Sequence, residues 1–205
     1  MLNIGVLISG GGTNLQAIID NIESGNINGE IKLIISNRKE AYGLTRGANA
    51  GIDSLFLDRK SFHSEEEYNL ELIKLFKARD IELIILAGYL KVLSKKFIQE
   101  FSGRIINVHP SLIPSFSGKG YYGDKVHQAV LDYGVKITGA TVHFVDEGTD
   151  TGPIILQDIV CIDSKDTALS LKEKVLDVEH KLLVQAVKLY CDKRISLDGR
   201  KVITY

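Results

Sequence analysis

Short apolar runs alternate, in the first half of the chain, with segments whose apolar positions recur every three or four residues. A run of four to eight apolar residues is typical of a strand buried on both faces of a sheet, and the recurring pattern is typical of a helix. The runs predict strands over residues 2–8, 31–36, 54–57, 81–86 and 104–108. The recurring positions predict helices over residues 13–23 and 42–50, and a third that Ser64 begins.

Strands that alternate with helices of this length are joined by right-handed crossovers. They build a mostly parallel, doubly wound sheet with helices on both faces, so the sequence predicts an α/β, Rossmann-like fold. Ligands of such sheets bind beyond the carboxyl ends of the strands. Residues 9–13, 87–93 and 107–120 are therefore expected to face one cleft.

The pattern changes after Val135. Residues 137–145 and 154–162 predict two long strands joined by an acidic turn, an antiparallel C-terminal extension of the sheet. A last amphipathic helix is expected over residues 166–191, with Gly199 in a final turn. Neither a repeat nor a linker is evident, and 205 residues can bury one large core, so we expect a single domain over residues 1–205.

Composition and charge narrow the class of protein. The chain is 44% hydrophobic and 25% charged, with a formal net charge of −1 and no run of Lys or Arg, so neither nucleic acid nor membrane is an expected partner. The N-terminus has the pattern of a first strand rather than of a signal peptide, and no segment has the apolar length of a membrane helix. Cys161 and Cys191 are too few for a disulfide scaffold or a zinc site. We expect a cytoplasmic protein with reduced thiols, of unknown oligomeric state.

The strand over residues 104–108 ends in the most informative motif. Asn107 and His109 lie two positions apart, so they project to the same side of the strand, and Pro110 ends it. An amide and an imidazole on one face can stabilise an oxyanion or transfer a proton. A buried histidine bonded to the backbone is the structural alternative. The loop that follows, rich in proline and glycine, favours a site.

A glycine loop joins the first strand to the first helix. Gly10, Gly11 and Gly12 let the backbone approach an anion, and the helix N-terminus supplies free N–H groups. The dinucleotide fingerprint is not met, because Leu15 occupies the place of its third glycine, and no Gly-Lys-Ser/Thr of a phosphate-loop hydrolase follows. A single phosphate, as on a sugar phosphate or mononucleotide, is the indicated ligand. A tight turn between strand and helix is the alternative.

The sequence alone does not assign a function to two further segments, residues 143–153 and residues 88–93. The turn over residues 146–153 is acidic, but acidic residues are common in turns and spacing alone singles out no carboxylate. His143 precedes that turn on a predicted strand, where a histidine is more often structural. The histidines and nearby acids never take a metal-ligand spacing, so no metal is expected. Residues 88–93 are either filler beneath a lid or the wall of a pocket for a flat aromatic ligand.

Together these motifs resemble the glycinamide ribonucleotide formyltransferases of purine biosynthesis, which use a formylated folate. The resemblance extends from the first strand to residues 198–202 and is carried by residues 8–18, 86–89, 107–114, 139–145 and 150–155. The Asn-x-His-Pro-Ser-Leu core is common to the folate formyltransferases of this fold. The glycine loop is the more specific motif, because it implies a substrate phosphate.

The resemblance implies a reaction and a role for particular residues. The formyl group of 10-formyltetrahydrofolate, a co-substrate, would pass to the amine of glycinamide ribonucleotide in de novo purine (IMP) biosynthesis. The implied catalytic residues are Asn107, His109 and Asp150. The implied contacts of the ribonucleotide are Gly12, Thr13, Asn14 and Glu179. The implied folate contacts are Leu90, Lys91, Val92, Leu93, Asn107 and His143. The loop over residues 146–152 is implied to bind the pteridine, largely through its backbone.

Two positions depart from the family, which often has arginine where Glu65 and Lys91 stand. The first substitution reverses a charge, so Glu65 is left out of the expected site. How the glutamate tail of the folate is held is left open.

In the implied reaction, the catalytic residues must stabilise the oxyanion and accept the amine proton. We expect an ionised Asp150 to raise the pKa of His109 and keep it charged, so that His109 and the Asn107 amide both stabilise the oxyanion. Asp150 accepts the amine proton, directly or through a water, and no metal is needed. The alternatives are another folate-dependent formyltransferase or formyl-folate hydrolase of the same fold, and a phosphate-binding module without chemistry.

Overall fold

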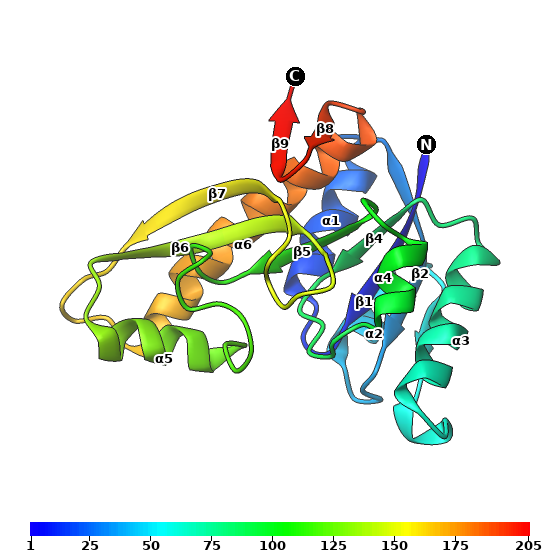
Figure 1. The fold of residues 1–205 in the computed structure, drawn as a ribbon, viewed down its shortest axis with the longest axis horizontal. Helices are drawn as coiled ribbons and strands as arrows, with labels where there is room; N and C mark the ends of the chain where they lie inside the picture. Colours follow the sequence, from blue (N-terminus) through cyan, green and yellow to red (C-terminus); the bar gives the residue numbers. More distant parts are fainter. The chain divides into compact units, whose positions relative to one another are not determined.

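The computed structural model describes residues 1–205. The main sheet has the strand order β3-β2-β1-β4-β5-β6-β7, and β8 and β9 form a separate two-stranded sheet (Figure 1). The chain divides into two compact units, Met1–Ile106 and Asn107–Tyr205, and β5 (Ile105–His109) begins in the first and ends in the second. None of the helices combines the length and the apolar character that a bilayer crossing requires.

The first unit contains the parallel part of the sheet. Its strands are β1 (Leu2–Ile8), β2 (Gly29–Ser36), β3 (Ser54–Phe56) and β4 (Leu83–Leu86). Its helices are α1 (Thr13–Glu23), α2 (Tyr42–Asn49), α3 (Glu65–Lys77) and α4 (Lys95–Glu100), with a 3-10 turn at Arg59–Ser61. The pairs β1–β2, β1–β4 and β2–β3 are all parallel.

Helices cover both faces of β1, and two contacts of this strand prove it. A Cβ on Gly5 would lie 2.6 Å from the ring of Phe76 in α3, so only glycine lets this helix pack so closely. A Cβ on Gly43 of α2 would lie 2.5 Å from the side chain of Ile8. Since Gly5 and Ile8 differ by an odd number of positions, they face opposite sides of the sheet, and so do α3 and α2.

The helix α3 begins as the sequence predicts. The Ser64 hydroxyl accepts from the Glu67 amide at 3.1 Å, and the acidic first turn is favourable at the positive end of the helix dipole. Its buried face holds Phe76, which makes edge-on ring contacts with Phe97 and Phe101, each at 6.1 Å between centroids. These contacts join α3 to α4.

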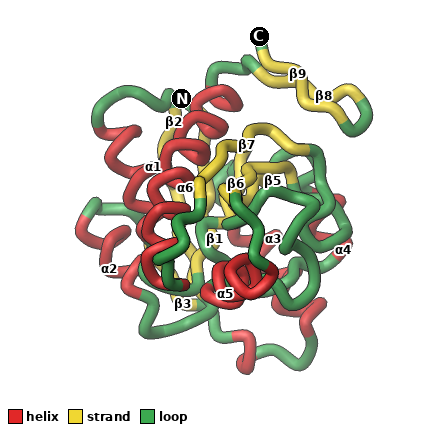
Figure 2. The backbone as a smooth tube through the Cα atoms, turned by 90° about the vertical axis from the view of Figure 1, so that its left-hand side faces the viewer, coloured by secondary structure: helices red, strands yellow, loops and turns green.

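The second unit contains the antiparallel part of the sheet. Its elements are α5 (Asp124–Tyr133), β6 (Ile137–Phe144), β7 (Ile154–Cys161), α6 (Ala168–Cys191), β8 (Ile195–Asp198) and β9 (Lys201–Thr204). The strands β6 and β7 pair antiparallel, with an irregularity in register between Val142 and His143. Figure 2 shows β8 and β9 as a hairpin that ends at the C-terminus. Gly199 lies in its turn, because Asp198 pairs with Lys201.

The predicted α/β fold, with a mostly parallel sheet and an antiparallel C-terminal part, is confirmed. The strand over residues 2–8 and the helix over residues 13–23 have the predicted ends, and the other predicted elements shift only at their termini. Five elements were not predicted: Arg59–Ser61, Lys95–Glu100, Asp124–Tyr133, and the strands Ile195–Asp198 and Lys201–Thr204, of which only the turn at Gly199 was expected. The first two are too short for a helical period to stand out in the sequence.

Candidate active site

The end of β5 carries the amide and the imidazole that the sequence indicates. His109 is buried, with 4% of its surface exposed, and Asn107 is half-buried. Both residues belong to the second unit, as do His143 and Asp150. The expected catalytic group therefore lies within one unit.

The two ring nitrogens of His109 face different acceptors. Nε2 lies 2.9 Å from the backbone oxygen of Phe116. Because a carbonyl can only accept, Nε2 carries a hydrogen and donates it. Nδ1 lies 3.4 Å from Oδ2 of Asp150, beyond the usual hydrogen-bond range of about 2.7–3.2 Å. In the neutral ring Nδ1 has no hydrogen, so this nitrogen is the one that can gain a proton.

Asp150 adopts a backbone conformation that few side chains reach. Its φ is 57°, in the left-handed region where Asp and Asn are the commonest residues after glycine. Its Oδ2 accepts from the amide of Gly118 at 2.9 Å, and its Oδ1 lies 3.7 Å from Nε2 of His143. Burial raises the pKa of Asp150, but contacts with His143, His109 and the Gly118 amide together outweigh it. The pKa of the carboxyl is therefore below its ordinary value, and Asp150 is ionised at neutral pH.

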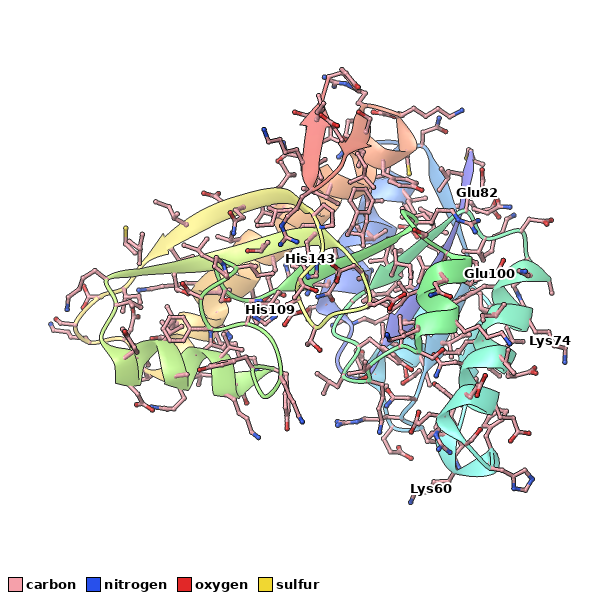
Figure 3. The ribbon with its side chains drawn as sticks, viewed as in Figure 1. Lys60, Lys74, Glu82, Glu100, His109 and His143 are labelled. Carbon is pink, nitrogen blue, oxygen red and sulfur yellow. The ribbon has the colours of Figure 1, made fainter.

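His143 contacts the Asn107 amide. Figure 3 labels His143, near the end of β6, and His109, at the end of β5. Nδ1 of His143 lies 2.8 Å from the backbone oxygen of Phe144, so Nδ1 carries a hydrogen and donates it. Nε2 then accepts from Nδ2 of Asn107 at 3.1 Å. The second N–H of that amide is left for an oxyanion.

The pKa of His109 departs from the expectation made from the sequence. Burial lowers the pKa, whereas Asp150 and the hydrogen bond to Phe116 raise it, and the net result is a pKa below the ordinary value of 6.5. Asp150 thus raises the pKa of His109 as expected, but burial lowers it by more. The prediction that His109 is kept charged is wrong for the free protein, because the cost of burying a cation exceeds the gain from the neighbouring carboxylate.

The acidic turn contains two carboxylates with different uses. Asp146 accepts from the Gly148 amide at 3.1 Å and from the Thr151 hydroxyl at 2.5 Å, which is ordinary turn chemistry. Asp150 instead faces the two histidines. Spacing alone could not separate them.

The glycine loop of the first unit, residues 10–12, packs against α2. Gly12 has a φ of 71° at the start of α1, and a Cβ there would lie 2.7 Å from the Cα of Gly43. Arg46 donates from Nε to the backbone oxygen of Gly11 at 2.8 Å. A Cβ on Gly10 or Gly11 would meet nothing within 4 Å, so packing does not require glycine there. A backbone left accessible in this way suits an anion.

The segment after β4 forms one wall of a cavity in the first unit. The cavity has a volume of about 400 Å³ and is lined by Glu65, Asn69, Lys91, Val92, Leu93 and Ser94. Ser9 connects this segment to the glycine loop, because its buried hydroxyl accepts from the Leu90 amide at 2.9 Å. Leu90 itself does not line the cavity.

Glu65, left out of the expected site, does line this cavity. Its carboxylate pairs with Nε of Arg59 at 2.8 Å. The charge reversal relative to the family is partly offset by this neighbouring cation, which no motif in the sequence indicates. Asn69, which no sequence motif indicates either, also lines the cavity. Its amide donates to the backbone of Glu65 and its oxygen accepts from the Ser94 amide, which joins α3 to the cavity loop.

The remaining expected contacts are divided between the units. Thr13 and Asn14 begin α1 in the first unit, directly after Gly12. Glu179 lies on α6 in the second unit, with 9% of its surface exposed. No group of three or more His, Cys, Asp or Glu side chains is arranged to hold a metal ion.

Comparisons with known proteins identify the family of the chain. Residues 2–187 match the family model described as formyl transferase. The chain is 39% identical over 197 residues to a phosphoribosylglycinamide formyltransferase of Haemophilus influenzae, with 96% of this chain and 91% of the relative covered. It is 39% identical to the chloroplastic enzyme of that name from Arabidopsis thaliana, over 94% of this chain, but it spans only 66% of that relative.

A solved structure agrees with these relatives. The glycinamide ribonucleotide transformylase 1 of Symbiobacterium toebii superposes with a TM-score of 0.95 and is 40% identical. The match covers 100% of this chain and 94% of that one.

Proposed function

The chain belongs to the formyl transferase family, and on this premise we propose that it transfers the formyl group of 10-formyltetrahydrofolate to the amine of glycinamide ribonucleotide. The products are formylglycinamide ribonucleotide and tetrahydrofolate, and the step belongs to de novo purine biosynthesis. The substrates are small molecules. We assign the reaction to the cytoplasm.

One observation carries the proposal. Asn107, His109, His143 and Asp150 form a connected polar group in which each side chain has a defined partner. Such a group contains one amide hydrogen for an oxyanion and one acceptor pair that lacks a proton. Acyl transfer from a folate to an amine needs both.

The chemistry follows from the protonation states. A primary amine of this type has a pKa near 8, so part of the substrate is already neutral at pH 7. Its nitrogen attacks the formyl carbon, and the Asn107 N–H stabilises the oxyanion that forms. The amine then loses a proton to the Asp150 carboxylate or to Nδ1 of His109, directly or through a water. The protonated pair returns a proton to the leaving nitrogen of the folate.

Each substrate is assigned to the residues that the resemblance to the family implies. We propose that Gly12, Thr13 and Asn14 bind the phosphate and ribose, with Glu179 of the second unit on the ribose hydroxyls. The folate is assigned to Leu90, Lys91, Val92 and Leu93, with Asn107 and His143 of the second unit. An accessible glycine backbone at a helix N-terminus supports the first assignment, and the cavity beside Lys91 supports the second.

Replacing Asn107 by alanine is expected to lower kcat by about 10²–10³-fold, the usual cost of removing one oxyanion donor. The side chain contacts His143 at the edge of the site, so the fold is expected to survive. Steady-state kinetics on both substrates measure the loss. A rise in KM with an unchanged kcat would mean that Asn107 binds substrate and does not stabilise the transition state.

Replacing Glu65 by glutamine tests the charge of the cavity wall. The change removes a carboxylate and leaves the Arg59 cation, so we expect the KM for a formyl-folate with an anionic tail to fall about threefold, the size of an exposed ion-pair effect. The gain should shrink as salt is added. Glu66→Gln, an exposed neighbour outside the cavity lining, is the matched control. An unchanged KM would remove the folate tail from this cavity.

An omission assay tests the function as a whole. The protein is incubated with 10-formyltetrahydrofolate and glycinamide ribonucleotide, each left out in turn, while the absorbance of the folate is followed. Transfer that depends on both substrates is the expected result. Release of tetrahydrofolate without the ribonucleotide would identify a formyl-folate hydrolase. Binding of the ribonucleotide without any turnover would identify a phosphate-binding module.

A further inference from the structure

Both members of the proton-accepting pair are held by one short backbone segment. The backbone oxygen of Phe116 accepts from Nε2 of His109 at 2.9 Å, and two residues later the amide of Gly118 donates to Oδ2 of Asp150 at 2.9 Å. The same two side chains approach each other at 3.4 Å. The segment from Phe116 to Gly118 therefore contacts His109 and Asp150 at once, without contributing a reacting atom.

We infer that residues 116–118 are a positioning segment, which sets the tautomer of His109 and its separation from Asp150 for the proposed formyl transfer. This inference rests on the proposed function, and it deepens the roles of the catalytic residues. The carbonyl of Phe116 keeps the hydrogen on Nε2, and so leaves Nδ1 facing the carboxylate as the nitrogen that gains a proton. The amide of Gly118 fixes the carboxylate oxygen on the other side of that gap.

The backbone of the segment is held in an uncommon conformation. Phe116 has a φ of 50°, which is unusual for a residue with a bulky side chain, and Gly118 has a φ of 86°. Non-glycine residues in this region persist only where their surroundings hold them, and they concentrate at functional sites. Ser111, which is fully buried, donates to the backbone oxygens of Ser115 and Phe116 at 2.7 and 3.2 Å. These bonds anchor the start of the segment.

Aromatic contacts anchor its side chain. The Phe116 ring meets Tyr121 edge-on at 6.2 Å and Tyr133 of α5 edge-on at 5.7 Å between centroids. Tyr133 has 79% of its surface exposed and contacts none of the catalytic residues in this way. Replacing Tyr133 therefore perturbs the segment without changing a catalytic residue.

The titratable groups around His109 are Asp150, His143 and His127, and burial is the largest influence on its pKa. Release of the segment would expose the ring and remove the Phe116 acceptor. The loss of burial then dominates, so the pKa of His109 should rise towards its ordinary value, and both neutral tautomers should become populated.

The test combines ¹⁵N NMR of the imidazole rings with kinetics. The variants are Phe116→Gly, which tolerates the backbone conformation but removes the ring, and Tyr133→Leu. Tyr205→Leu, another exposed tyrosine of the second unit, is the control. The His109 signals are identified by their loss in His109→Gln, and thermal unfolding confirms that each variant is folded. If Phe116→Gly does not fold, Tyr133→Leu decides.

We expect the wild-type ring to be in the Nε2–H form, and both variants to show a tautomer mixture with a raised pKa. For Phe116→Gly, kcat should fall about 10- to 100-fold, the effect of misplacing a catalytic group by about 1 Å, while both KM values change little. For Tyr133→Leu the fall should be about two- to tenfold, the equivalent of one aromatic pair. Tyr205→Leu should match the wild type.

Other outcomes separate the two proposals. A retained Nε2–H form in the folded variants would overturn the positioning role, whether or not kcat falls. Unchanged kcat despite a tautomer mixture would overturn it as well. A wild-type protein without formyl transfer, whose variants still show the tautomer mixture, would overturn the proposed function and leave the positioning of His109 supported.

Discussion

Replacing Asp150 by alanine is expected to lower kcat by at least about 10²–10³-fold, as much as the loss of an oxyanion donor. The change removes the carboxylate that pairs with Nδ1 of His109, together with the acceptor of the Gly118 amide. Asp150→Asn is the sharper variant, because it keeps the shape and removes the charge. Single-turnover measurement of formyl transfer separates the chemical step from product release.

The control for Asp150 is a carboxylate of the same unit without a role in the site. Asp158, exposed on β7, accepts only from the neighbouring Ile159 amide, and Asp158→Asn should leave kcat unchanged. Near-normal turnover in Asp150→Ala would contradict the assignment of Asp150 as part of the proton acceptor. His109 would then have to accept the proton alone.

Replacing His109 by alanine is expected to cost at least as much in kcat, because the same substitution removes the proton carrier and its bond to Phe116. The kcat/KM of this variant against pH gives a second measurement. The pKa of His109 in the wild type is below 6.5, so the neutral ring predominates at pH 7. Activity should therefore be lost as the pH falls through a value below 6.5, when the ring becomes protonated and can accept nothing more.

The two variants are expected to change the acid limb of the pH profile differently. His109→Ala should lack it, and its residual rate should follow only the substrate amine, whose pKa is near 8. In Asp150→Asn the limb should lie at still lower pH, since the carboxylate raises the pKa of His109 in the wild type. An acid limb that persists unchanged in His109→Ala would belong to another group.

The strands of the main sheet, the Asn107–His109 pair and the glycine loop could be predicted from the sequence, because each depends on a local pattern of residues. Strand alternation places Asn107 and His109 on one face, apolar runs predict the buried strands, and consecutive glycines mark the loop before α1. Each of these inferences depends on residues within a few positions of one another. Backbone geometry then follows with little help from the rest of the molecule. The same local motifs indicate the family.

Tertiary structure decided which polar groups lie together and which protonation state they favour. Asp146 and Asp150 are equivalent acids of one turn in the sequence, and only the fold places the second beside two histidines. The pKa of His109 is set by burial, a property of the packed molecule, and it reversed the charge expected from the neighbouring carboxylate. Burial and contacts between distant positions depend on how the chain closes on itself, and spacing along a sequence does not contain that information.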